Sequence, residues 1–147
     1  MRVRDERNNL CRPWTKESLA DWFETEGSAF LTNKRRPVRA RVIIASQIEN
    51  TVVQSVSAYL KGRGFTPTFR PIGMVRKNGK KRIRSAECEL LSNEEQECFL
   101  RQIEPLLRTE RIRNQVRAIR DWLRERRRQI ETQKFRGRFR HLECPEL

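Results

Sequence analysis

Hydrophobic residues near the start of the chain are spaced as on an α-helix. Leu19, Trp22 and Phe23 recur at intervals of three and four residues, the period that one helix face requires. Thr15 stands before them as a suitable N-cap residue, and Gly27 follows them as glycines often do at helix ends. The pattern predicts an amphipathic helix between Thr15 and Gly27.

The spacing changes to a two-residue alternation between residues 28 and 47. The stretch NKRRP, at residues 33–37, is typical of a turn, so the segment is predicted to be a β-hairpin. Its second strand, residues 38–47, places apolar residues on one side, whereas the other side carries Arg39, Arg41, Ile43, Ala45 and Gln47. The apolar side is expected to face a core. Two arginines and a glutamine indicate that the second side does more than contact water.

Helical spacing returns over residues 49–65, and the alternation returns over residues 66–92 around a turn at Asn78-Gly79. Two more helices are predicted, one over residues 92–107 and one from Thr109 onward. The resulting order is α-β-β-α-β-β-α-α. It indicates the α+β class, with both hairpins in one antiparallel sheet of four strands and the helices on one face.

The charge of the chain points to a polyanionic partner. Its 147 residues include 33 Lys+Arg and 19 Asp+Glu, a formal net charge of +14, and most of the basic residues are arginine. Arginine suits forked contacts to phosphates and to guanine, so nucleic acid is the leading candidate. We expect one domain over residues 15–132, an N-terminal arm at 1–14 and a loosely tied basic tail at 133–147.

Other classes of protein are not favoured. No stretch is long and apolar enough for a membrane span and the first residues are polar. We therefore expect no membrane partner, no signal peptide and a cytoplasmic location, at an archaeal or bacterial nucleoid or within an organelle. The four cysteines form no CxxC pair and the single histidine lies apart from most of them, so a zinc site is not expected. The cysteines are predicted to be buried free thiols unless the source is a hyperthermophile.

The stretch LADWFETEG, at residues 19–27, resembles the nine-residue motif of LAGLIDADG homing endonucleases of the single-motif type. Leu19, Ala20 and Gly27 are identical to the motif, and Glu24 and Glu26 replace acid with acid. The resemblance implies the αββαββα homing-endonuclease fold over roughly residues 15–125, with the sheet as a DNA-binding surface. One departure is an aspartate where the family usually has glycine, which puts close approach of two motif helices in question.

The resemblance also implies a metal site at the end of the first helix. The Glu26 carboxylate and the backbone carbonyl of Thr25 would bind Mg²⁺, or another divalent metal, against the scissile phosphates. Elementary chemistry agrees, because magnesium prefers hard oxygen ligands, and a cation at a helix C-terminus offsets the unfavourable dipole on a carboxylate there.

Further catalytic residues are assigned by the same resemblance. Gln47 ends the second strand, on the side of Arg39 and Arg41, and would reach the metal or its water; a hydrogen bond at the end of the sheet is the equally strong alternative. A basic residue near the start of the last helix, Arg111 or Arg113, would complete the site.

DNA contacts are predicted along both hairpins. A two-stranded ribbon fits the major groove of DNA, and the basic residues expected to hold or read it are Arg39, Arg41, Arg70, Arg76, Lys77, Lys80, Lys81, Arg82 and Arg84.

The first helix is apolar in two directions, and the second direction is predicted to meet its own copy about a two-fold axis. The interface would consist of Leu19, Ala20, Phe23 and Glu24. Such a homodimer predicts a pseudo-palindromic target.

The resulting functional hypothesis is a site-specific double-stranded DNA endonuclease, encoded by an intron or intein, that hydrolyses phosphodiesters with Mg²⁺. Two alternatives stay open at this point. One is an RNA maturase, which would bind intron RNA and assist splicing. The other is a DNA-binding regulator without catalysis, although such a protein has no reason to keep Glu26 beside a phosphate.

Overall fold

A computed structural model of the protein describes residues 14–32, 37–47, 50–134 and 144–147. The predicted order of helices and strands is confirmed. The elements are α2 (Lys16–Glu26), β1 (Ser28–Leu31), β2 (Ala40–Gln47), α3 (Asn50–Gly62), β3 (Thr68–Lys77), β4 (Lys80–Leu90), α4 (Asn93–Ile103), the short 3-10 helix η1 (Glu104–Leu106) and α5 (Glu110–Lys134).

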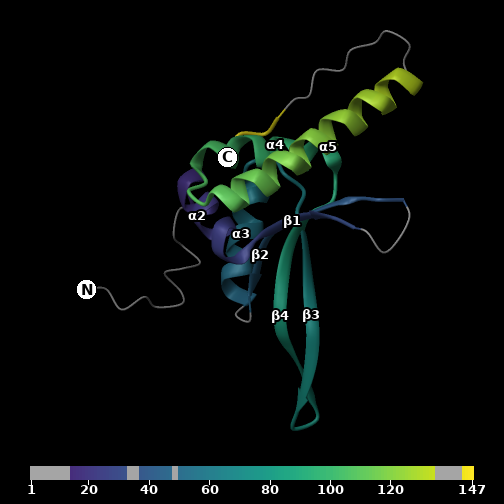
Figure 1. Ribbon diagram of the computed structural model, residues 1–147. Helices are drawn as coiled ribbons and strands as arrows, with labels where there is room; N and C mark the ends of the chain where they lie inside the picture. Colours follow the sequence, from purple (N-terminus) through teal and green to yellow (C-terminus); the bar gives the residue numbers. More distant parts are fainter. Residues whose placement is uncertain (1–13, 33–36, 48–49, 135–143) are drawn as a thin grey trace.

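The four strands form one antiparallel sheet in the order β1-β2-β4-β3, and the helices gather on one of its faces (Figure 1). The β3–β4 hairpin is the longest pair of strands and extends well beyond the helical layer (Figure 1). Its turn has positive φ angles of 54° at Asn78 and 75° at Gly79, as expected for the two-residue turn that the Asn-Gly pair predicts.

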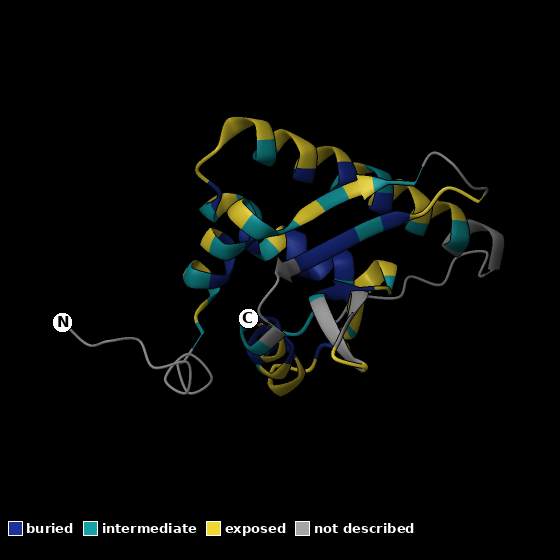
Figure 2. Cartoon of the chain, turned by 90° about the horizontal axis from the view of Figure 1, so that it is seen from below, coloured by how far each residue is buried: buried dark blue, intermediate teal, exposed yellow. Residues whose placement is uncertain are grey.

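The core lies between the helices and the sheet. Alternate residues of β4, namely Ala86, Cys88 and Leu90, are fully buried in this core, and α3 packs against β4. The aromatic rings of Phe23 in α2 and Phe99 in α4 meet edge to face, with centroids 5.8 Å apart. Because every helix buries apolar side chains on this one face, the opposite face of the sheet is left without a helical cover among the described residues, as the view from below shows (Figure 2).

Gly27 ends α2 for a reason different from the left-handed turn that helix-ending glycines usually supply. Its φ angle is −94°, in the extended region. A Cβ atom at this position would lie 2.9 Å from the carbonyl oxygens of Ile43 and Ile44 and 2.4 Å from the ring of Phe23. The glycine therefore allows the end of α2 to cross the backbone of β2 closely.

The end of the chain corrects two predictions. Cys98 of α4 and Cys144 form a disulfide, so these two cysteines are not free thiols; Cys88 is free and buried, as predicted. Gln102 donates a hydrogen bond to the carbonyl oxygen of Pro145 (2.7 Å) and accepts one from the backbone N–H of Leu147 (2.9 Å). The last four residues are thus fastened to α4 rather than loosely tied.

The start of the last helix matches the sequence, and α5 continues to Lys134. Pro105 lies in η1 and separates α4 from α5, as its lack of an N–H donor predicts. None of the described helices combines the length and the apolar character needed to cross a membrane.

Candidate nucleic-acid interface

The two carboxylates at the end of α2 have different surroundings. The Glu24 carboxylate accepts hydrogen bonds from the backbone N–H groups of Arg108 and Thr109 and from the Thr109 hydroxyl, the last two at 3.4 Å. These groups stand at the N-terminus of α5, where unpaired N–H donors and the helix dipole favour an anion. Glu24 therefore joins α2 to α5 within one chain.

Glu26 is half-buried and forms no hydrogen bond or ion pair with any residue that the structure describes. It lies in the last turn of α2, where the final carbonyl groups of a helix have no partner within the helix. The Thr25 hydroxyl donates to the carbonyl oxygen of Trp22 (3.1 Å), so the backbone carbonyl of Thr25, and not its side chain, is the group available next to Glu26.

These oxygen donors suit magnesium in kind but are few in number. Mg²⁺ is usually held by one or two carboxylates together with waters and phosphate oxygens. Among the described residues, no group of three or more histidine, cysteine, aspartate or glutamate side chains is placed to hold a metal ion. Within the part of the chain that the structure describes, Glu26 is therefore not part of a cluster of three metal-binding side chains.

The predicted place of Gln47 is wrong because β2 contains an irregularity. The pairing of β2 with β4 shifts by one residue between Ile43 and Ala45. Beyond this β-bulge Gln47 pairs with Ala86, a residue of the core side. A one-residue shift exchanges the two faces of a strand, so Gln47 does not share the face of Arg41.

Arg111 and Arg113 lie in the first turns of α5, which Glu24 attaches to α2. Arg111 is exposed, whereas Arg113 is half-buried and its Nε atom has no hydrogen-bond partner. The structure therefore brings the start of α5 close to the end of α2. It does not distinguish between Arg111 and Arg113 as the predicted basic residue of the site.

The predicted dimer residues of α2 lie in the chain's own core. Leu19, Ala20 and Phe23 are exposed by only 0%, 1% and 2%, because α2 packs on β2 on one side and on α4 and η1 on the other. These two contacts account for the two apolar directions of the helix, so no second copy is needed to cover them. The exposed side of α2 instead carries Glu17, Asp21 and Thr25.

The uncovered face of the sheet carries an ion-pair network across three strands. Arg41 of β2 donates to Glu89 of β4 from Nε (2.8 Å) and Nη2 (2.9 Å), and from Nη2 also to Glu87 (3.2 Å). Arg70 of β3 forms an ion pair with the same Glu87 oxygen. The hydrogen bonds and charges of the two glutamates raise the pKa of Arg41, with the bond to Glu89 as the largest cause. We name this set of four residues the sheet network.

Glu87 and Glu89 are the residues of this surface that the prediction missed. They alternate with buried Ala86, Cys88 and Leu90 in the stretch AECEL. That alternation could have identified them. Two acids on the outer face of a central strand need charged or hydrogen-bonding partners on the neighbouring strands.

The strand register also separates the basic residues of the β3–β4 hairpin into two rows. Arg70 pairs with Glu87, so Arg76 and its partner Lys81, six residues toward the turn, belong to the same row. The positions of Lys77, Lys80, Arg82 and Arg84 belong to the opposite row. The two rows therefore do not form one reading face, although both lie on the projecting hairpin (Figure 1).

Arg39 precedes β2 and is exposed. Its backbone N–H donates to the Thr32 hydroxyl (3.0 Å), and its carbonyl oxygen accepts from the Thr32 N–H (2.8 Å). These bonds extend the pairing of β1 with β2 and leave the side chain without a described partner.

Comparison with known proteins gives one informative result. No protein-family model and no curated protein sequence matches the chain. Its structure is similar to the homing endonuclease I-CvuI, solved in complex with the I-CreI target in the presence of 2 mM Mg with the DNA not cleaved. The TM-score is 0.51 and the identity 14%, over 74% of this chain and 65% of that chain. The chain has a homing-endonuclease fold.

Several arginines of the helical layer form ion pairs within the chain. Arg117 and Arg120 of α5 pair with Glu104 of η1, and Arg124 and Arg127 pair with Glu97 of α4. The row of arginines on α5 thus serves in part to fasten α5 to α4.

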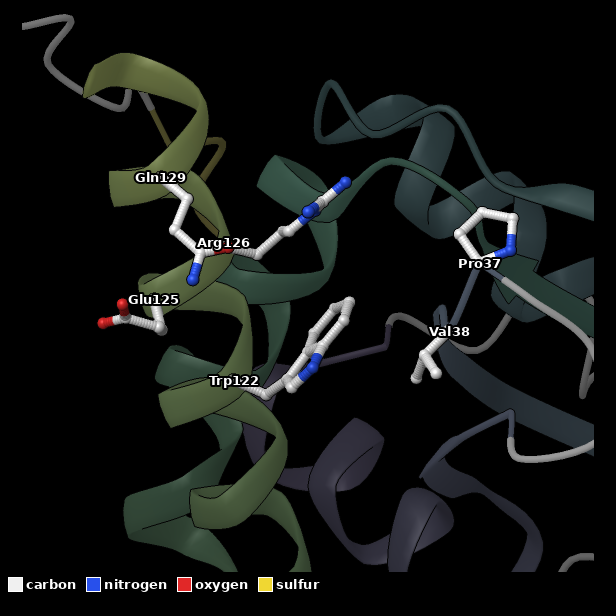
Figure 3. Close-up of a pocket in the computed structure, with 6 residues that line it drawn as sticks. All are labelled: Pro37, Val38, Trp122, Glu125, Arg126 and Gln129. Carbon is white, nitrogen blue, oxygen red and sulfur yellow. The ribbon is translucent and has the colours of Figure 1, made fainter. Parts of the chain in front are cut away.

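A hollow lies between α5 and the residues that lead into β2 (Figure 3). The indole of Trp122 faces Pro37 and Val38 across this hollow. The other residues that line the hollow are Glu125, Arg126 and Gln129. None of the residues predicted from the sequence to form the functional site lines this hollow.

Proposed function

We propose that the protein is a site-specific DNA endonuclease that hydrolyses phosphodiester bonds with a divalent metal ion, Mg²⁺ or a similar one. The observation that carries the proposal is Glu26. It is a carboxylate at the end of α2 with no partner among the described residues, although it lies in a chain whose basic groups far outnumber its acids. A carboxylate that is not engaged in an ion pair is available to a hard divalent cation, which prefers oxygen ligands.

The sheet and its long hairpin support DNA as the substrate. The face that the helices leave uncovered carries Arg41 and Arg70, and the hairpin beyond it carries the pairs Arg76–Lys81 and Lys77–Lys80. Like charges placed opposite one another on paired strands repel, so the hairpin is best stabilised when a polyanion neutralises them. A duplex groove of suitable width is such a partner.

The catalytic groups of this chain would be Glu26 and the Thr25 carbonyl as metal ligands, with an arginine from the start of α5, Arg111 or Arg113, near the phosphate. The metal ion, when bound, orients water and neutralises the charge that develops on the phosphate. Glu24 acts at a distance from the phosphate, because it holds the start of α5 against α2. Gln47 stays a weaker candidate, since its register places it on the other side of β2.

Cutting both strands of a duplex favours two copies of the chain, because each contributes one Glu26. We propose a homodimer that forms through the exposed side of α2, where Asp21 stands between Glu17 and Thr25. Two copies of Asp21 would then face each other near the axis. We expect their repulsion to keep the dimer weak in the absence of DNA and metal.

The test begins with DNA selection. The full chain is incubated with a pool of randomised duplexes, the bound fraction is sequenced, and the enriched duplex is placed in a supercoiled plasmid. We expect the enriched site to be pseudo-palindromic and the plasmid to be linearised with Mg²⁺ but not with EDTA. An enriched site that is bound but never cut under any divalent metal would favour the DNA-binding regulator, and binding of structured RNA alone would favour the maturase.

A further inference from the structure

Glu87 occupies the centre of the uncovered sheet face. It belongs to β4, the strand between β2 and β3, and it is only 4% exposed. One of its oxygens accepts a hydrogen bond from Arg41 on one side and from Arg70 on the other. A carboxylate so deeply buried is stable only with such charged partners.

Arg41 uses most of its donors within the chain. Its Nε donor and both Nη2 donors point to Glu89 and Glu87, and its guanidinium lies 5.7 Å from the centroid of the Phe30 ring. Only 28% of the side chain is exposed. Recognition of guanine by arginine needs two donors on one edge of the guanidinium, and Arg41 retains donors on Nη1 alone.

Arg70 has the opposite character. Its side chain is 54% exposed, and the described contacts use only one of its nitrogens, Nη2, in the bond to Glu87. Nη2 carries one N–H on each edge of the guanidinium and Glu87 accepts from one of them, so one complete edge keeps two donors for a ligand. The contact with Glu87 limits the orientations of a long side chain before any ligand binds, and such a guanidinium loses less entropy when it forms a forked contact.

We propose that Arg70 reads a guanine of the DNA target in the major groove and that Glu87 is its positioning residue, held in turn by Arg41 and Glu89. This inference rests on the proposed function, since it assumes duplex DNA on the uncovered face. It assigns Arg41 to the support of the network rather than to base recognition. It also explains why Glu87 and Glu89 lie on a surface that is proposed to bind a polyanion: they orient the arginines.

Charge balance indicates that the network contributes selectivity more than affinity. Two glutamates compensate the two arginines, so the sheet network adds no net positive charge for phosphates. The basic residues at the end of the hairpin and Arg39 would hold the phosphates. Base preference at one position and general affinity for DNA should therefore respond to different substitutions.

The experiment selects DNA from a randomised duplex pool with the wild-type chain and with the variants R70A, R70K and E87Q. Arg101, an exposed residue of α4 on the helical side, supplies the matched control R101A. For the wild type we expect a guanine at one position of each half-site. Both Arg70 variants should lower the preference for that guanine by roughly 5- to 150-fold, and R70K should keep the affinity for unselected DNA.

E87Q should lower the same preference at the same position while the affinity for unselected DNA stays equal or rises, because a negative charge is removed. Thermal unfolding of E87Q shows whether the substitution causes a general loss of structure. If E87Q does not fold, R70K, at an exposed position, still tests whether Arg70 recognises the guanine. Retention of the guanine in E87Q while R70A loses it would overturn the role of Glu87, and retention in R70A and R70K would overturn the role of Arg70. A wild-type chain that selects no duplex sequence at all would overturn the proposed function itself, whereas R101A is expected to select the wild-type site.

Discussion

Glu24 and Glu26, in the last turns of α2, are residues of one type with different surroundings. An acid at a helix C-terminus is unfavourable by itself. Glu24 escapes this cost because its carboxylate reaches the N-terminus of α5, where the dipole has the opposite sign. Glu26 has no such partner among the described residues, and a bound cation would stabilise it.

Glu24→Ala tests the first half of this account. The substitution removes the acceptor that caps α5, and we expect the free energy of unfolding to fall by about 0.5–2 kcal/mol. Thermal or urea unfolding followed by circular dichroism measures the change. The matched control is Asp121→Ala, at an exposed position of α5, which should change stability little; equal effects of the two substitutions would contradict the capping role.

The buried thiol of Cys88 leads to a prediction about pH. Burial raises the pKa of Cys88 to about 12, so the thiol is neutral at pH 8 and only about one molecule in ten thousand carries a thiolate. In a Cys11→Ser background, in which the disulfide occupies Cys98 and Cys144, we expect alkylation by iodoacetamide to be very slow in the folded chain. It should become fast in urea. Fast alkylation without denaturant at pH 8 would show that Cys88 is not buried as described.

At the scale of elements, the order and type of helices and strands follow from the sequence, but their faces follow only in part. The alternation in β2 correctly identified Ala40, Val42 and Ile44 as core residues. The bulge after Ile43 then moved Gln47 to the other row, and no local sequence signal marks that bulge. It occurs where the end of α2 passes close to the backbone of Ile43 and Ile44, a contact that the local sequence of β2 does not show.

The helices show the same limit. The two apolar stripes of α2 were correctly identified, but a single sequence does not say whether the second stripe meets another helix of the same chain or a second copy. The structure places Ala20 and Phe23 in the chain's own core. A bulky substitution such as Ala20→Trp is therefore expected to destabilise the fold rather than to separate two subunits.

The disulfide that joins α4 to the C-terminal residues predicts an effect of reductant on stability. It links cysteines separated by 46 residues, and a loop of that size is expected to contribute about 2–4 kcal/mol. We expect dithiothreitol to lower the unfolding temperature of the wild-type chain. The Cys144→Ser variant should unfold at the lower temperature with and without reductant, and a wild-type chain indifferent to reductant would contradict the bond.

At the scale of the whole molecule, the charges divide into two groups with different functions. Acids on α4 and η1 compensate arginines of α5 and fasten the helical layer. On the other side, the hairpin extends away from the helices, and its strand register pairs Arg76 with Lys81 and Lys77 with Lys80. The net charge of +14 predicts a polyanionic partner, and the fold adds which surface the helices leave uncovered.

The central claim is that Glu26 is a metal ligand of an endonuclease, and its most direct test compares binding with cutting. Glu26→Gln keeps the size of the side chain and removes its charge, with Glu94→Gln, at an exposed position of α4, as the control. On the selected duplex with Mg²⁺, we expect Glu26→Gln to bind as tightly as the wild type and to lose cleavage by at least about a hundredfold, whereas Glu94→Gln cuts normally. Cleavage by Glu26→Gln at the wild-type rate would contradict the account.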